Sequence, residues 1–258
     1  LSSGGTAKDF GDLTTARRTV GGASSSTRGI FFAGNTSNVI DFITISSAGN
    51  ATDFGDALAN KTDFAAHSNN TRCVSSGGGS TDVIEFITIA SAGNSTDFGN
   101  LSVASRDQLG TCASTTRGIF AGGDVNPKTP IDYITIASAG NASDFGDLTV
   151  GRHALGGCSN ATRGVFGGGN SDADLNTIDY ITISSTGDAS DFGDLTSAQR
   201  LYGTATAGTV KGLFSLAATG NVDSVTISST GNASDFGDLS VGRYGAGALS
   251  DTNVSSQP

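Results

Sequence analysis

Two sets of basic residues recur along the chain, and arginine binds carboxylates, phosphates and acidic sugars well because its guanidinium is planar and always charged. Members of the first set each precede a short β-prone segment: Arg28, Arg72, Arg117 and Arg163, with Lys211 in the fifth unit. An acidic residue follows each of them in a later segment: Asp41, Glu85, Asp132, Asp179 and Asp223. Because a base and an acid recur together, we expect charge-assisted pairs between neighbouring strands, with a structural role.

The second set lies where one repeating unit passes into the next: Arg17, Arg106, Arg152, Arg200 and Arg243, with Arg18 beside the first. A ring of these side chains at one mouth of the fold could bind an anion or an acidic sugar.

The loops between the second and third predicted strands vary most from unit to unit: Asn35–Asn38, Gly77–Asp82, Asp124–Pro130, Asn170–Asn176 and Thr219–Asn221. Variation on a repeated scaffold concentrates where partners are met, although surface loops also drift without function. Within these loops the candidate binding residues are Asp124, Asn126, Lys128, Asp172, Asp174 and Asn176.

The residue types needed for catalysis or metal binding are sparse. The two histidines, His67 and His153, occupy different offsets in their units and cannot form a repeated ligand ring. The alternating oxygen ligands at Asp172, Asp174 and Asn176 lack the glycine and the closing glutamate of a calcium loop. The repeated Asp-Phe-Gly triplet resembles a kinase motif, but no glycine-rich phosphate loop or catalytic loop accompanies it. We therefore expect no catalytic residue, no metal and no cofactor.

The elements that must position these residues follow from an internal repeat. The Asp-Phe-Gly triplet begins at Asp9, Asp53, Asp97, Asp144, Asp191 and Asp235, with spacings of 44, 44, 47, 47 and 44 residues. Between the triplets lie an acidic β-branched segment, IDFITI in its first copy, and a segment of the type TRGIF. Taking 150–196 as the clearest unit, we predict strands at 152–159, 162–167, 178–184 and 190–196. Four short strands in 44 to 47 residues match the size of a propeller blade.

Apolar residues lie on both faces of the predicted third strand. Ile178 and Tyr180 point to one face, whereas Ile181 and Ile183 flank the other. A strand of this kind suits a blade packed between two neighbours. The phenylalanines of the triplets are expected to pack between blades: Phe10, Phe54, Phe98, Phe145, Phe192 and Phe236.

Composition excludes several other classes. The 258 residues include 38 glycines, no methionine and no tryptophan, and only 15% are charged, which argues against helical bundles. A formal net charge of −10 repels phosphate backbones, so nucleic acid is not expected as a partner. No apolar run approaches the roughly 18 residues of a membrane span. The three cysteines are expected to be buried and free, because equivalent positions in adjacent blades lie too far apart for a bridge.

These motifs resemble the kelch-type β-propeller repeat: a first-strand arginine, glycines closing the second strand, an acidic-aromatic third strand and a fourth-strand aromatic. The usual fourth-strand tryptophan of that family is replaced here by phenylalanine. The variant with TRGIFAGG, IDYITI and GNASDFGDL is also similar to repeats in virion proteins of tailed phages from aquatic bacteria. The kelch resemblance implies that the connection from the fourth strand to the next first strand shares a face with the loop between the second and third strands.

We therefore expect an all-β propeller that forms a single domain over residues 1–258. The complete repeats are 14–58, 59–102, 103–149, 150–196 and 197–240, and the partial repeats 1–13 and 241–258 contribute a lone fourth and a lone first strand. The ring is five- or six-fold, and a sixth blade would either be defective or take its missing strands from a longer chain or a neighbour.

The phage resemblance implies a non-enzymatic virion or extracellular protein that binds other virion subunits, or a host surface glycan or protein. A bacterial surface or filament protein is the first alternative, and an intracellular protein-interaction module is the second.

Overall fold

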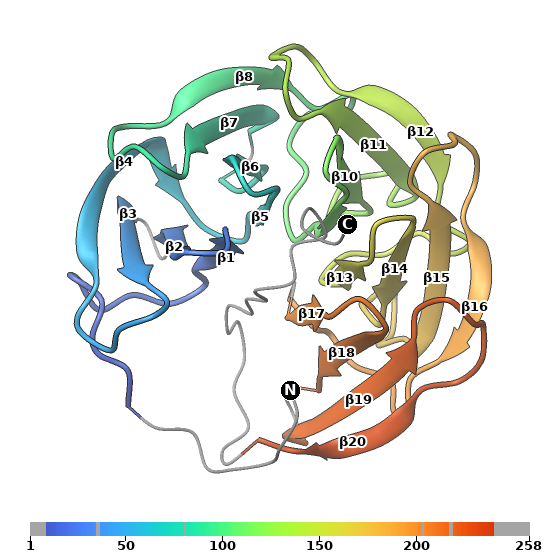
Figure 1. Ribbon diagram of the computed structural model, residues 1–258. Coiled ribbons are helices and arrows are strands. Elements are labelled where there is room, and N and C mark those ends of the chain that lie inside the picture. The colour runs from blue at the N-terminus through green and yellow to red at the C-terminus, as the bar shows by residue number, and fades with distance from the viewer. Residues whose placement is uncertain (1–8, 35–36, 80, 203, 217–218, 240–258) are drawn as a thin grey trace.

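The protein is a five-bladed β-propeller in a computed structural model that describes residues 9–34, 37–79, 81–202, 204–216 and 219–239. Each blade is an antiparallel sheet of four strands in sequence order. Figure 1 shows the first strand of every sheet facing the centre of the ring and the fourth strand on the rim. Blade 1 comprises β1 (Gly21–Ser24), β2 (Arg28–Gly34), β3 (Ser37–Thr44) and β4 (Thr52–Lys61). Blade 2 comprises β5 (Ala65–Ser68), β6 (Arg72–Ser76), β7 (Val83–Thr88) and β8 (Thr96–Asn100).

The other three blades repeat this plan. Blade 3 comprises β9 (Gly110–Ala113), β10 (Arg117–Ala121), β11 (Pro130–Thr135) and β12 (Ser143–Asp147). Blade 4 comprises β13 (Gly156–Ser159), β14 (Arg163–Gly167), β15 (Thr177–Thr182) and β16 (Ser190–Asp194). Blade 5 comprises β17 (Ala205–Ala207), β18 (Lys211–Ser215), β19 (Asn221–Thr226) and β20 (Ser234–Asp238). The all-β prediction is confirmed. Within the described ranges there is no helix at all, and hence none able to cross a membrane.

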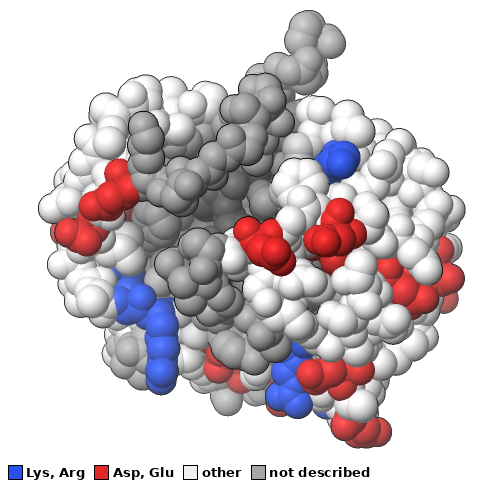
Figure 2. All heavy atoms as spheres, turned by 90° about the horizontal axis from the view of Figure 1, so that it is seen from below, with Lys and Arg blue, Asp and Glu red and all other residues white. Residues whose placement is uncertain are grey.

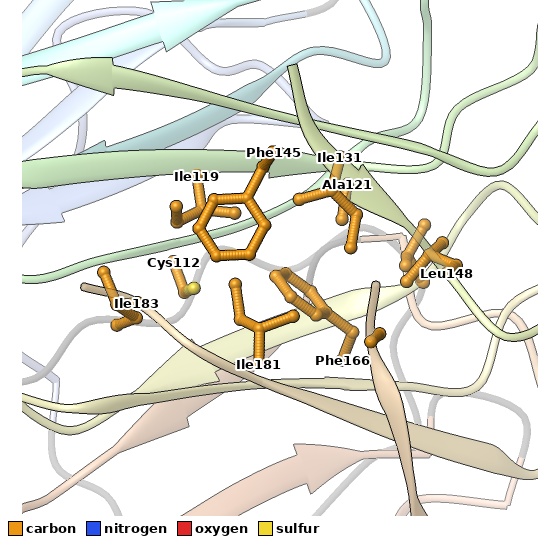
Figure 3. Packing of buried hydrophobic residues seen from close by; sticks show 11 residues of the cluster. Cys112, Ile119, Ala121, Ile131, Phe145, Leu148, Phe166, Ile181 and Ile183 are labelled. Carbon is orange, nitrogen blue, oxygen red and sulfur yellow. The ribbon is translucent and has the colours of Figure 1, made fainter. Parts of the chain in front are cut away.

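Hydrophobic clusters fill the four interfaces between successive blades. At the interface of blades 3 and 4, Phe145 from the outer strand of blade 3 packs with Ile181 and Ile183 from the third strand of blade 4 (Figure 3). The opposite face of that strand places Ile178 and Tyr180 in the cluster shared with blade 5. The predicted alternation along the third strand is therefore confirmed, and it arises because successive strand residues point to opposite faces.

Near the axis, side chains from the first strand of one blade pack against glycines in the second strand of the next blade. Gly164 in β14 faces Cys112 of the previous blade, and a Cβ there would come within 2.6 Å of the Cys112 sulfur. Gly212 of blade 5 faces Cys158 in the same way, at 2.8 Å. The glycine of the second strand is thus needed because it accommodates a first-strand side chain. All three cysteines are buried and free, as expected.

On the rim, the outer strands of blades 1 to 4 are each joined to the next blade at their Asp-Phe-Gly triplet. The amide of Gly187 in blade 4 donates to the carbonyl of Phe145 in blade 3 at 2.7 Å. Gly146 has φ +145°, and a Cβ on it would come within 2.5 Å of the Gly187 carbonyl carbon. Glycine is required at this position both for its backbone conformation and for the close approach.

Two sequence predictions about the strands are wrong. The first strand of blade 4 begins at Gly156 rather than Arg152, because the intervening residues include Ala154 with φ +55°, a left-handed backbone that departs from the extended conformation of a strand. Among the six triplet phenylalanines, the four between successive blades are 2–3% exposed, but Phe10 is 37% and Phe236 is 50% exposed. Phe236 lies in β20, the last strand before the sector between blades 5 and 1, and Phe10 precedes the first strand of blade 1 (Figure 1).

Candidate binding face

The acidic residues of the third strands pair with the second basic set, not with the first as the sequence predicted. Arg152 Nη1 lies 2.8 Å from Asp179 Oδ2, and both side chains are 0% exposed. Thr149 Oγ1, from the end of the preceding blade, also donates to Asp179 at 2.5 Å. The same pairing joins Arg17 to Asp41 and Arg106 to Asp132. Burial lowers the pKa of Arg152, and the negative charge of Asp179 opposes that shift.

The predicted mouth ring of arginines is therefore corrected at Arg17, Arg106 and Arg152. Their guanidinium groups are buried and already paired, so they tie the start of each first strand to the third strand of its blade. Arg200 is exposed and lies one residue beyond the equivalent position, which is Gln199 in blade 5. Arg243 lies outside the described residues.

The first basic set stacks on aromatic rings. Arg163 pairs in register with Thr182 on β15, so Tyr180, two residues away on the same face, is its diagonal neighbour, whereas Asp179 points to the other face. The Arg163 guanidinium carbon lies 4.3 Å from the Tyr180 ring centroid, and Nη1 donates to the Ile227 carbonyl of blade 5 at 2.9 Å. Three further arginines repeat both contacts: Arg28, Arg72 and Arg117. These residues join adjacent blades, so their structural role holds while their predicted partners were wrong.

In blade 2, Lys61 takes the place of the arginines that pair with the third-strand acids, which the sequence analysis missed. Lys61 Nζ lies 2.6 Å from Glu85 Oε1, with side chains 3% and 0% exposed. The signal was present, because Lys61 follows the Asp-Phe-Gly aspartate by eight residues, as Arg17 and Arg152 do. In this pair lysine replaces arginine and glutamate replaces aspartate, so the longer side chain of the acid offsets the different geometry of the base.

The loops after the second strands and the connections into the first strands share one face, as the kelch resemblance implied. Backbone hydrogen bonds join them: Gly123 N to the Arg152 carbonyl at 3.0 Å, and Asn170 N to the His153 carbonyl at 2.8 Å. On this face, side chains from the loops of blades 3 and 4 and from the connections into blades 4 and 5 form one polar group. We call it the loop cluster, and its members are Asp124, Lys128, His153, Asn170, Asp174 and Arg200.

Within the loop cluster, each cation already contacts an acid. Asp124 Oδ1 lies 3.4 Å from Lys128 Nζ and 3.6 Å from His153 Nδ1. Burial lowers the pKa of His153, so this imidazole is neutral at neutral pH even though Asp124 favours its charged form. The contacts of Asp124 thus join the loop between β10 and β11 in blade 3 to the connection that leads into blade 4.

The second half of the loop cluster joins blades 4 and 5. Asp174 accepts from Asn170 Nδ2 at 2.7 Å and from Arg200 Nε at 3.0 Å, and the hydrogen bond from Asn170 lowers its pKa. A hydrogen bond with Tyr202 raises the pKa of Arg200. The side chains of Asp124, Asp174 and Arg200 remain 51%, 46% and 43% exposed.

The structure thus brings together four of the predicted binding residues: Asp124, Lys128, Asp174 and Arg200. Asn126 and Asp172 are exposed in the same two loops, and Asn176 is half-buried beside them. The sequence analysis excluded His153 as a metal ligand and missed it as a member of this polar cluster; its place next to Arg152 in the connection was the available signal.

The mouth of the axis is narrow. Residues with left-handed backbones stand at the start of the first strands, and hydrogen bonds link them across blades: Gln108 N to the Asp63 carbonyl at 2.6 Å and Ala154 N to the Gln108 carbonyl at 2.8 Å. The cavity beside them, lined by Thr19, Phe64 and Tyr202 among others, has a volume of about 40 Å³. Pockets for small organic ligands span roughly 300 to 1,000 Å³, so this cavity suits a few waters only.

Charge is distributed in small groups. Figure 2 shows acidic and basic side chains as separate patches of both signs, with uncharged surface between them. Among the residues whose placement is described, no group of three or more His, Cys, Asp or Glu side chains is arranged to hold a metal ion.

The fold and the loop cluster together define a class: a β-propeller with a polar surface formed by loops from several blades. Neither a scan against known protein families nor a search of curated proteins found a match. The arrangement offers surface hydrogen-bond donors and acceptors on a rigid ring, which is chemistry for recognition.

Proposed function

We propose that this protein is a non-enzymatic recognition scaffold of kelch type, which binds a hydroxyl-rich partner through the loop cluster. The observation that carries the proposal is the convergence of Asp124, Lys128, Asp174 and Arg200 from three blades on one face. Binding residues commonly lie on loops held by a rigid scaffold, and this ring is held by buried ion pairs and hydrophobic interfaces.

Charge balance within the loop cluster favours a neutral polar ligand over a strong anion. Lys128 and Arg200 each contact an aspartate, so an incoming phosphate or carboxylate would have to compete with an existing acid. Sugar hydroxyls both donate and accept, and they can bridge an exposed aspartate and a neighbouring base at once. A surface glycan fits this chemistry better than the acidic sugar expected from the sequence.

We place the scaffold in a phage virion, as an appendage or decoration domain that contacts a host surface glycan or neighbouring subunits. This part of the proposal rests on the similarity of the TRGIFAGG, IDYITI and GNASDFGDL repeats to virion proteins of tailed phages. A bacterial surface or filament protein would use the same face in the same way.

The test is binding of the purified chain to arrayed bacterial surface glycans and to intact aquatic bacteria. Lys128→Ala and Arg200→Ala, both at exposed or half-exposed positions, should reduce binding at least tenfold without changing the melting temperature. Arg18→Ala in blade 1 is the matched control, because Arg18 is also exposed on a connection between blades. Equal loss in the control, or full binding by both cluster variants, would refute the loop cluster as the binding surface.

Exchange of the loops provides a second test. Replacing residues 124–129 and 170–176 by the short version at Thr219–Asn221 should leave folding nearly intact, since loop length has a small entropic effect. Pro130 is retained because its carbonyl accepts from buried Arg106 at 2.8 Å. Retained glycan binding by a folded exchange variant would contradict the proposal.

A further inference from the structure

Beside blade 1, residues 9–12 lie in the position that the outermost strand of a sixth blade would occupy. Gly11 has φ +144°, matching Gly55 and Gly99 at 144° in complete blades. Gly49 N donates to the Phe10 carbonyl at 2.8 Å, as Gly93 N does to Phe54 at 2.7 Å. Residues 9–12 are therefore locked against blade 1 in the conformation of an outer strand.

Hydrogen bonds of side chains follow the same pattern. Asp12 N donates to Asn50 Oδ1 at 3.0 Å, and Thr14 Oγ1 donates to Asp41 Oδ1 at 2.6 Å. The equivalent bonds in a complete interface are Asp56 N to Asn94 at 3.0 Å and Thr149 Oγ1 to Asp179 at 2.5 Å. No third strand pairs with residues 9–12 among the described residues, whereas every complete blade has one.

Both surfaces that face the sector between blades 5 and 1 are exposed where their equivalents are buried. Phe236 of blade 5 is 50% exposed, against 2–3% for the four equivalents between successive blades. Ile45 of blade 1 is 37% exposed, against 0–1% for Ile89, Ile136, Ile183 and Ile227. A Cβ on Gly237 would meet no atom of the described residues within 4 Å, but the equivalent Gly193 would meet the next blade at 2.6 Å.

Polar groups on blade 5 are also left facing this sector. Lys211 occupies the position of Arg163, which donates to the third-strand end of the next blade. It is exposed and lies 5.3 Å from the Phe236 ring centroid. A depression of about 370 Å³ runs beside it along β19, where Ser224 stands in place of the aromatic residue of other blades.

We propose that this sector is a docking slot for a β-hairpin of the repeat's own type that lies outside residues 1–258, and that its two strands become the second and third strands of a sixth blade. The four complete interfaces define its chemistry. A third strand of the type IDYITI would pair with residues 9–12, direct two isoleucines toward Phe236 as Ile181 and Ile183 are directed toward Phe145, and present its terminal carbonyl to Lys211.

Residues 1–258 do not themselves contain a spare copy of this hairpin. Residues 241–258 repeat only the first-strand pattern, and no further copies of the second- and third-strand patterns exist in residues 1–258. A folded second copy is not a suitable donor either, since its five hairpins are all paired within their own blades. The third strand of the hairpin would provide the hydrogen-bonded neighbour that residues 9–12 do not have among the described residues. Binding of this kind, in which a peptide adds a strand to an exposed edge, is a known mode of recognition.

The test uses the full 258-residue chain and a dye-labelled peptide with the sequence of residues 162–184, which spans β14, β15 and their loop. We expect saturable one-to-one binding by fluorescence anisotropy, together with slower amide hydrogen exchange in residues 9–12. Phe236→Asp should weaken binding at least tenfold, because it places a charge on the docking surface without disturbing the free fold. Val150→Asp is the matched control, because Val150 is 40% exposed in the connection between blades 3 and 4, away from the slot. This variant should bind the peptide like the unmodified chain.

A peptide with Asp at the positions of Ile181 and Ile183 should not bind. Fusion of the unmodified segment after residue 258 through a flexible linker should raise the melting temperature, and fusion of the Asp peptide should not. Absence of binding, or equal binding by Phe236→Asp, would overturn the proposal. So would a concentration-dependent dimer of the free chain that Phe236→Asp dissociates, because a second copy would then occupy the slot.

Discussion

Blades 4 and 5 are copies of one repeat, but only blade 4 has a complete blade on both sides. In blade 4, Asp179 is paired with buried Arg152, and Tyr180 carries the stacked guanidinium of Arg163. In blade 5, Asp223 accepts from Thr196 Oγ1 at 2.8 Å, no cation among the described residues forms an ion pair with it, and Ser224 replaces the aromatic ring. The aromatic stack is therefore kept where a neighbouring blade covers it, whereas the ion pair is lost in blade 5 because Gln199 stands at the position of Arg152.

The largest contrast is expected at the triplet phenylalanines. Phe145→Ala should lower the free energy of unfolding by about 3 to 5 kcal/mol, because it leaves a cavity between blades 3 and 4. Phe236→Ala should cost less than about 1 kcal/mol, since half of that side chain is already in water. Urea denaturation of both variants measures this, and equal costs would mean that the sector beside blade 5 is closed.

A second contrast concerns the buried acids. Asp179→Asn should cost about 3 kcal/mol, because it leaves the buried Arg152 charge without its counter-ion. Asp223→Asn should cost clearly less, since Asp223 accepts from the amide and hydroxyl of Thr196 and not from a buried cation. In double-mutant cycles, Arg152 and Asp179 should couple by more than about 1 kcal/mol, whereas Arg163 and Asp179 should be additive. Coupling of the latter pair would contradict the register described above.

A pH effect is expected at His67, whose place in the first strand is taken by Cys112 and Cys158 in the next two blades. Burial lowers the pKa of His67 to about 3, whereas the unfolded chain takes up the proton near 6.5. Stability is therefore fully present above pH 6.5 and falls by about 1.4 kcal/mol per pH unit as the pH drops toward 3.

The variant His67→Cys should remove this slope. Its unfolding free energy, relative to the unmodified chain, should rise by about 2 to 3 kcal/mol between pH 6.5 and 4.5. Denaturation series at pH 8, 6.5, 5.5 and 4.5 provide the measurement, and the pH 8 series is the control. Parallel pH profiles for the two proteins would mean that His67 is protonated in the folded state.

The smallest contrast is at the stacked cations. Arg163→Ala should cost about 1 kcal/mol through loss of the Tyr180 stack and the bond to Ile227. Lys211→Ala, at the exposed equivalent in blade 5, should change stability by less than about 0.5 kcal/mol. Thermal unfolding distinguishes them, and a larger cost at Lys211 would show that this lysine has a partner in the free protein.

The sequence by itself determined the blade architecture, the alternation of Ile178 and Ile181 between two faces, and the burial of the cysteines. These features repeat with a fixed period, and a strand residue's face depends only on whether its position is odd or even. The choice of ion-pair partner was decided by tertiary structure. Arg163 and Arg152 both recur with Asp179, but only the register, which sets Arg163 opposite Thr182, shows that Asp179 points away from Arg163.

Exposure was also beyond the sequence. Phe145 and Phe236 belong to the same motif, and nothing within the motif distinguishes them. Their difference arises because Phe145 meets the third strand of blade 4, whereas Phe236 faces the sector between the ends of the ring. The loop cluster formed for the same kind of reason: Asp124, Asp174 and Arg200 lie far apart along the chain, and the packing of successive blades brings them together on one face.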